Sequence, residues 1–86
     1  MKYIRQNVTA DDASVPTTGV KFSGRQLMTF YPTASATFEV FFKVAGTWFP
    51  VTPHTGAGPF EVEMPDTAEV TCKITGVTTS TDLFVK

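Results

Sequence analysis

The feature that most constrains the fold is the alternation of apolar residues in the stretch 36–51, ATFEVFFKVAGTWFPV. Four apolar side chains occupy every second position there: Phe38, Val40, Phe42 and Val44. Successive side chains of a β-strand point to opposite faces, so these four share one face, which we expect to fill the core. Ala45-Gly46 predicts a tight turn, because glycine accepts the positive φ that such turns need. Residues 47–51 return as the partner strand of a β-hairpin.

The same period of two recurs along the chain, and turn-forming glycine, proline and aspartate residues separate the segments. Further strands are predicted at 2–9, 60–64, 68–75 and 82–86, and residues 20–31 are predicted to hold one or two strands, divided at Ser23-Gly24. No window of 11 residues has the 3.6-residue period of an amphipathic helix. The sequence therefore predicts an all-β fold of about seven short strands. We expect residues 1–86 to form a single small antiparallel β-sandwich or barrel.

The N-terminal part, residues 1–19, has the weakest pattern. The alternation in 2–9 predicts either an edge strand or an arm that docks on another molecule, followed by a loop at 10–19. Asp11 and Asp12 in that loop are the kind of ligand that calcium prefers. No further acid lies nearby at a suitable spacing, so we expect a solvated turn instead.

Composition excludes several classes of partner. The net charge of −1 gives no basic surface for nucleic acid. Cys72 is the only cysteine, so an intrachain disulfide is excluded. No apolar run approaches the roughly 20 residues of a membrane helix, and the first residues lack the pattern of a signal peptide, so we expect synthesis in the cytoplasm. Charged residues make up 17% of the chain, against about 25% in typical domains, which indicates that part of the surface contacts something other than water.

The residues that could support catalysis are few. His54 lies in the turn-rich loop 52–59, and Cys72 lies on the apolar face of the strand at 68–75, where a thiol behaves as a small core residue. A Cys–His nucleophile pair is therefore not favoured. Zinc needs at least three nitrogen or sulfur ligands, and this chain offers two. We expect no catalytic residue, no cofactor and no metal site.

Two carboxylates, Glu61 and Glu63, share one face of the strand at 60–64. Acid–base catalysis by such a pair needs a pocket that separates their pKa values, and an exposed strand face provides none. We expect them to pair across strands with Lys43 or Lys73.

Several aromatic residues lie out of phase with the main apolar face of their strand, namely Phe41, Phe49 and Phe84. Because each sheet of a sandwich has one inner face, such rings indicate a second buried surface, against another subunit or a host protein. The predicted interface set is Phe41, Trp48, Phe49, Phe84 and His54. In an alternative hypothesis, Trp48, Tyr31 and the loop 52–59 bind a sugar or a receptor.

A resemblance extends over residues 36–86. The order of TFEVFFKV, the hairpin AGTWFPV, a glycine-rich loop, FEVEMPDTAEVTCKITGV and a final DLFVK resembles small β-sandwich virion proteins of tailed bacteriophages. The resemblance implies a non-enzymatic structural protein, most simply a capsid decoration (cement) protein. Such a protein is made in the host cytoplasm, resides in the virion, and binds the major capsid protein or another virion protein as a small homo-oligomer, for which we expect a trimer. A neck or tail adaptor is the alternative within this group.

Overall fold

The computed structural model describes residues 2–12, 19–23, 27–65 and 69–86, and within these ranges it contains nine strands and no helix. The strands are β1 Lys2–Val8, β2 Val20–Lys21, β3 Leu27–Pro32, β4 Thr37–Val44, β5 Thr47–Pro50, β6 His54–Thr55, β7 Phe60–Glu63, β8 Glu69–Thr75 and β9 Thr81–Val85. The all-β prediction is confirmed. Two of the nine, β2 and β6, have only two residues each, which explains why sequence patterns indicated about seven.

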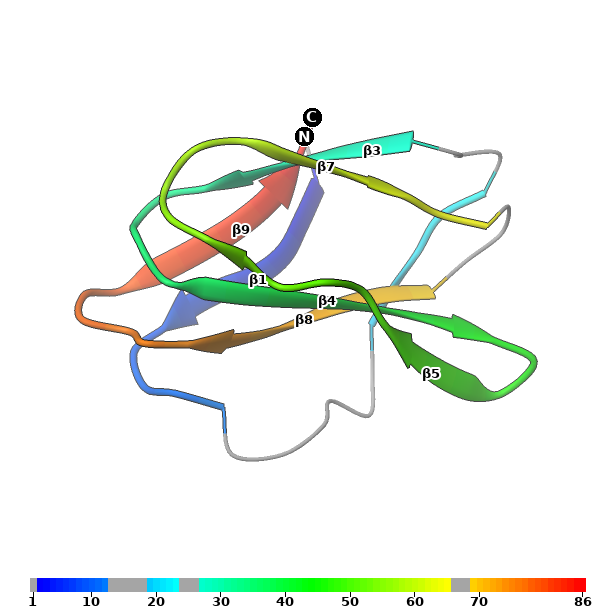
Figure 1. Ribbon diagram of the computed structural model, residues 1–86, viewed down its shortest axis with the longest axis horizontal. Helices are drawn as coiled ribbons and strands as arrows, with labels where there is room; N and C mark the ends of the chain where they lie inside the picture. Colours follow the sequence, from blue (N-terminus) through cyan, green and yellow to red (C-terminus); the bar gives the residue numbers. More distant parts are fainter. Residues whose placement is uncertain (1, 13–18, 24–26, 66–68) are drawn as a thin grey trace.

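The strands form two antiparallel sheets that pack face to face as a sandwich (Figure 1). The four-stranded sheet has the order β1-β9-β3-β7, and the five-stranded sheet has the order β2-β8-β4-β5 with β6 also paired to β4. Consecutive strands often change sheet, as β3 and β4 do, and β7 and β8. Neighbours in sequence are therefore often not neighbours in a ladder.

The core lies between the two sheets and contains the residues that alternate inward along each strand. Its fully buried side chains are Met28, Phe30, Phe38, Val40, Val70, Cys72, Ile74, Thr81 and Leu83. Phe60 joins the layers, since its ring stacks on Phe30 with centroids 5.2 Å apart and lies 6.0 Å from Phe38. Each fully buried large apolar side chain contributes about 1.5–3 kcal/mol, so this layer dominates the stability of the domain.

The predicted hairpin is present as β4 and β5, with Val44 paired to Thr47 across the turn. Ala45 and Gly46 both have positive φ, 51° and 81°, as a two-residue type I′ turn requires. The hairpin turn projects at one end of the molecule, at right in Figure 1. The expectation that Val44 fills the core is therefore wrong: this residue is 41% exposed, because the hairpin extends to where the opposite sheet no longer covers it.

The N-terminal segment is a strand rather than a free arm. Strand β1 pairs with β9 at the edge of the four-stranded sheet, and two irregularities interrupt their register. Asn7 has a φ of 54° near the second irregularity, and its N–H donates to the Asp82 carboxylate at 2.7 Å. Of the predicted loop, residues 13–18 lie outside the described part of the chain.

Candidate functional site

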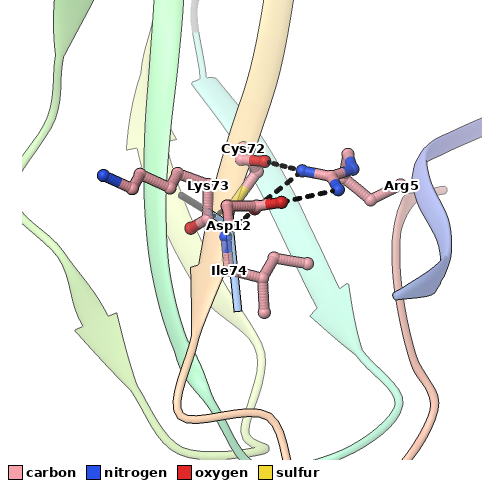
Figure 2. Close-up of polar contacts among 5 residues, drawn as sticks. All are labelled: Arg5, Asp12, Cys72, Lys73 and Ile74. Carbon is pink, nitrogen blue, oxygen red and sulfur yellow. Dashed lines mark hydrogen bonds and ion pairs between the residues drawn. The ribbon is translucent and has the colours of Figure 1, made fainter. Parts of the chain in front are cut away.

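A polar cluster joins the edges of the two sheets (Figure 2). Arg5 of β1 donates two hydrogen bonds to the Asp12 carboxylate, at 3.0 and 3.1 Å, and a third to the carbonyl of Cys72 in β8. Asp12 in turn accepts the Ile74 N–H at 2.6 Å, while its own N–H donates to the Ile74 carbonyl at 3.0 Å. The cluster satisfies backbone groups along the free part of the β8 edge. We call these four residues the edge clasp.

Hydrogen bonds lower the pKa values of both Asp11 and Asp12. Partial burial raises the pKa of Asp12, but hydrogen bonds from Arg5 and Ile74 and the charges of Arg5 and Lys73 outweigh it, so the pKa is lowered overall. Backbone N–H groups of Val77 and Gly76 lower the pKa of Asp11. Both carboxylates thus accept hydrogen bonds from the protein. Among the residues that the structure describes, no three His, Cys, Asp or Glu side chains are grouped as a metal site.

Cys72 and His54 lie apart. Cys72 is fully buried on the inner face of β8, and burial raises the pKa of its thiol to about 12, so it stays protonated. His54 belongs to β6, on the opposite edge of β4 from β8, which places two strand spacings, about 10 Å, between the two elements. The His54 ring stacks on Phe60 at 4.4 Å, and its buried Nε2 has no hydrogen-bond partner in the described part of the chain. His54, a member of the predicted interface set, packs against Phe60 of its own chain.

The two carboxylates of β7 do not meet the lysines predicted for them. Strand β7 pairs with β3 in the four-stranded sheet, whereas Lys43 and Lys73 belong to the five-stranded sheet. The register partners of these lysines are acidic residues of their own sheet: Lys43 faces Glu69, and Lys73 faces Glu39. The predicted pairing is wrong because the chain changes sheet between β7 and β8.

One exposed apolar surface is the hairpin patch, which we define as Phe42, Val44 and Phe49. Phe49 is 44% exposed, and its ring stacks on that of its register partner Phe42 with centroids 5.7 Å apart. The patch continues the apolar inner face of β4 beyond the covered core. Phe49 belongs to the predicted interface set, and its exposure leaves it accessible to a partner.

Two further hairpin aromatics, Phe41 and Trp48, lie on the outer face of the five-stranded sheet. Phe41 is only 6% exposed, with Pro50 and Thr71 as its register partners, so the prediction that this ring meets a partner disagrees with its burial in the single chain. Trp48 is half-buried, and the Lys43 ammonium lies 5.5 Å from its ring centroid. The indole also contacts Gly19, where an added Cβ would lie 3.0 Å from it.

A second exposed surface crosses the outer face of the four-stranded sheet. Tyr3, Phe84 and Tyr31 are register partners on β1, β9 and β3, with ring centroids 5.8 and 5.4 Å apart. Tyr3 is 37% exposed, and Leu27, on the same face of β3, is 52% exposed. We call Tyr3, Phe84, Tyr31 and Leu27 the outer patch. Because Trp48 lies on the other sheet, the single sugar-binding strip predicted from Trp48 and Tyr31 is not formed.

The predicted interface set contains Phe49 and Phe84, which lie in the two exposed patches, but not Tyr3, Leu27 and Val44, which lie there too. For Tyr3 and Leu27 a signal existed, since each is out of phase with a buried neighbour, Ile4 and Met28. For Val44 the sequence contains no such signal, because this residue is in phase with the buried residues of its strand.

No protein-family model, curated protein or solved structure matches this chain. No helix suited to crossing a membrane occurs in ranges 2–12, 19–23, 27–65 and 69–86. The fold and its surfaces define the class to which the chain belongs: a small antiparallel β-sandwich whose described residues form two separate exposed apolar patches.

Proposed function

We propose that this chain is a non-enzymatic structural protein of a tailed-bacteriophage virion, and specifically a capsid decoration protein that binds the capsid surface as a small homo-oligomer. The resemblance over residues 36–86 suggests the virion, and the hairpin patch is the observation that carries the contact role. In this proposal, the patch is the surface that docks on the capsid.

The geometry of the hairpin patch supports a binding role. Single exposed apolar residues are common on protein surfaces, but here two side chains more than 40% exposed lie beside a stacked pair of phenylalanines at a projecting end. Aromatic side chains that become buried at the centre of an interface often dominate its binding energy. A rigid two-residue turn holds these rings in place without a partner, which lowers the entropic cost of binding.

The positions of Cys72 and His54 also favour a contact role over catalysis. Cys72 is protonated and fully buried, whereas His54 belongs to a different strand and stacks on Phe60. Neither is presented to a substrate by the surrounding residues.

The proposal is tested by co-sedimentation of the purified protein with capsids and with tails of the encoding phage, each assembled without this chain. Decoration predicts saturable binding to capsids and none to tails. Phe49→Ser is expected to weaken capsid binding at least about tenfold, as loss of a central aromatic does. Ser80→Ala, at an exposed turn position away from both patches, is the matched control and should bind as wild type.

Binding to tails alone would replace decoration by the adaptor alternative. Binding to neither fraction, or capsid binding that Phe49→Ser leaves unchanged, would refute the role of the hairpin patch. Recognition of a glycan without any particle binding would favour the receptor-binding alternative.

A further inference from the structure

The outer patch has features of a protein contact rather than of a sugar platform. Its rings stand side by side, and Tyr31 and Phe84 stack nearly parallel, with an interplanar angle of 16°. The two rings therefore turn faces toward each other and leave less ring face free for a sugar to stack on. Leu27, more than half exposed, extends the apolar area along β3. Such a surface suits packing against another flat apolar surface.

The charges around the outer patch are arranged in opposite signs on either side of β3. In the β3–β9 ladder Phe30 pairs with Val85, so one step further places Lys86 beside Thr29. Thr29 is in turn the partner of Glu61 on β7. Lys86 thus lies one strand to one side of Thr29, and Glu61 one strand to the other. The Lys86 Nζ lies 5.0 Å from the Tyr31 ring centroid, which confirms that this side chain is on the outer face.

A two-fold axis that runs along β3 would exchange these charges. Rotation about this axis places each β3 residue opposite its own counterpart and exchanges the β9 side of the sheet with the β7 side. Lys86 of each copy would therefore face Glu61 of the other, which gives two ion pairs. Tyr31 and Leu27 would lie near the axis and pack against their own counterparts. An isologous contact of this kind needs a self-complementary surface, and this face has one.

We propose that the outer face of the four-stranded sheet is the self-association surface, and that its occupant is a second copy of this chain related by a two-fold axis along β3. The inference rests on the proposed function in that a small homo-oligomer needs a self-contact surface distinct from its docking surface. It specifies a dimeric contact in place of the trimer that the family resemblance implies.

Charge reversal tests this register. The dissociation constant of the dimer is measured by sedimentation equilibrium over a concentration series for wild type, Glu61→Lys, Lys86→Glu and the double variant. Each single reversal places like charges opposite each other twice and should raise the dissociation constant at least about tenfold. The double variant restores both pairs and should return to within about threefold of wild type.

Matched controls separate this surface from the hairpin patch. Phe49→Ser should leave the dimer unchanged, and Tyr31→Ser should weaken it; thermal unfolding followed by circular dichroism verifies that each variant folds. A wild-type protein that stays monomeric at every concentration, a trimer, or single reversals that the double variant does not rescue would overturn the inference. Wild-type protein that forms the dimer but binds no capsids would instead count against the proposed function alone.

Discussion

Replacing Asp12 tests how much the edge clasp contributes to stability. Asp12→Ala removes a carboxylate that accepts two N–H groups of Arg5 and the backbone N–H of Ile74. Asp12→Asn keeps the shape and one acceptor oxygen for Ile74 but removes the charge. The pair of variants therefore separates the ionic contribution from the hydrogen bond that covers the β8 edge.

The magnitude follows from the two kinds of contact. A hydrogen bond to a charged group contributes about 1.5–3 kcal/mol. The Arg5–Asp12 pair has side chains 26% and 18% exposed, so we assign it about 0.5–1 kcal/mol, near the surface value. Water can reach the Ile74 N–H once the side chain is removed, which favours the lower end of the range. We expect Asp12→Ala to cost about 2–2.5 kcal/mol, the sum of the two contributions, and Asp12→Asn about 0.5–1 kcal/mol, the ionic contribution alone.

The pH dependence gives a second, independent readout. The folded-state pKa of Asp12 lies below its ordinary value of 3.8, so the stabilisation is fully present above that value and is lost as the pH falls through the folded pKa. Wild type and Asp12→Asn should therefore differ at neutral pH and converge in acid. Asp11, whose pKa is also lowered, remains in both proteins and cancels in the comparison.

The assay is urea and thermal unfolding followed by circular dichroism, at neutral pH and below pH 4. A domain of this size shifts its midpoint by about 4–8 °C per kcal/mol, so Asp12→Ala should lower it by roughly 8–20 °C. An Asp12→Ala protein within about 0.5 kcal/mol of wild type at neutral pH would refute the assigned role. So would a difference between wild type and Asp12→Asn that does not change with pH.

Three further substitutions have defined expectations, each measured by urea unfolding. Ala45→Asn should raise stability by about 0.5–1 kcal/mol, because Asn tolerates the φ of 51° better than Ala; a loss would contradict the type I′ assignment. His54→Phe should stabilise by about 1 kcal/mol, since it keeps the stack on Phe60 and removes the unpartnered Nε2; lower stability would mean that this nitrogen is bonded. Gly19→Ala should cost about 1–3 kcal/mol, because its Cβ would lie 2.5 Å from the Val70 carbonyl oxygen; an unchanged free energy would refute that close approach.

The period-two pattern was enough to predict the strands, the Ala45-Gly46 turn and most of the core. It assigns a residue to a face but does not say how far the opposite sheet extends, and this is why Val44 was placed inside although the hairpin projects beyond the covering sheet. It also does not say which sheet a strand joins. The predicted pairing of Glu61 with Lys73 fails for this reason, because the chain changes sheet between their strands.

The same limit applies to the exposure of the aromatic residues in the predicted interface set. Phe41 and Phe84 are both out of phase with their strands, yet Phe41 is 6% exposed whereas Phe84 lies in an open row of aromatics. Their difference depends on what covers each outer face, which is a property of long-range packing. The edge clasp was likewise hidden, since Asp12 meets β8 more than 60 residues further along the chain.

Features that block strand pairing at the sheet edges restrict how the sandwich can associate. An open edge offers unpaired N–H and C=O groups to another strand, and such edges are commonly blocked. Here β5 contains Pro50, β1 is irregular, β7 has two exposed glutamates, and the clasp occupies Cys72 and Ile74 of β8. Strand addition is disfavoured at each of these edges, which favours contact through faces and projecting ends. The two apolar surfaces that the described residues leave open, the hairpin patch and the outer patch, lie on different sheets and can therefore be occupied at the same time. If the chain both self-associates and binds a particle, as proposed, each contact needs its own surface. A Glu61→Lys variant that is monomeric but still binds capsids would demonstrate that the two surfaces act separately.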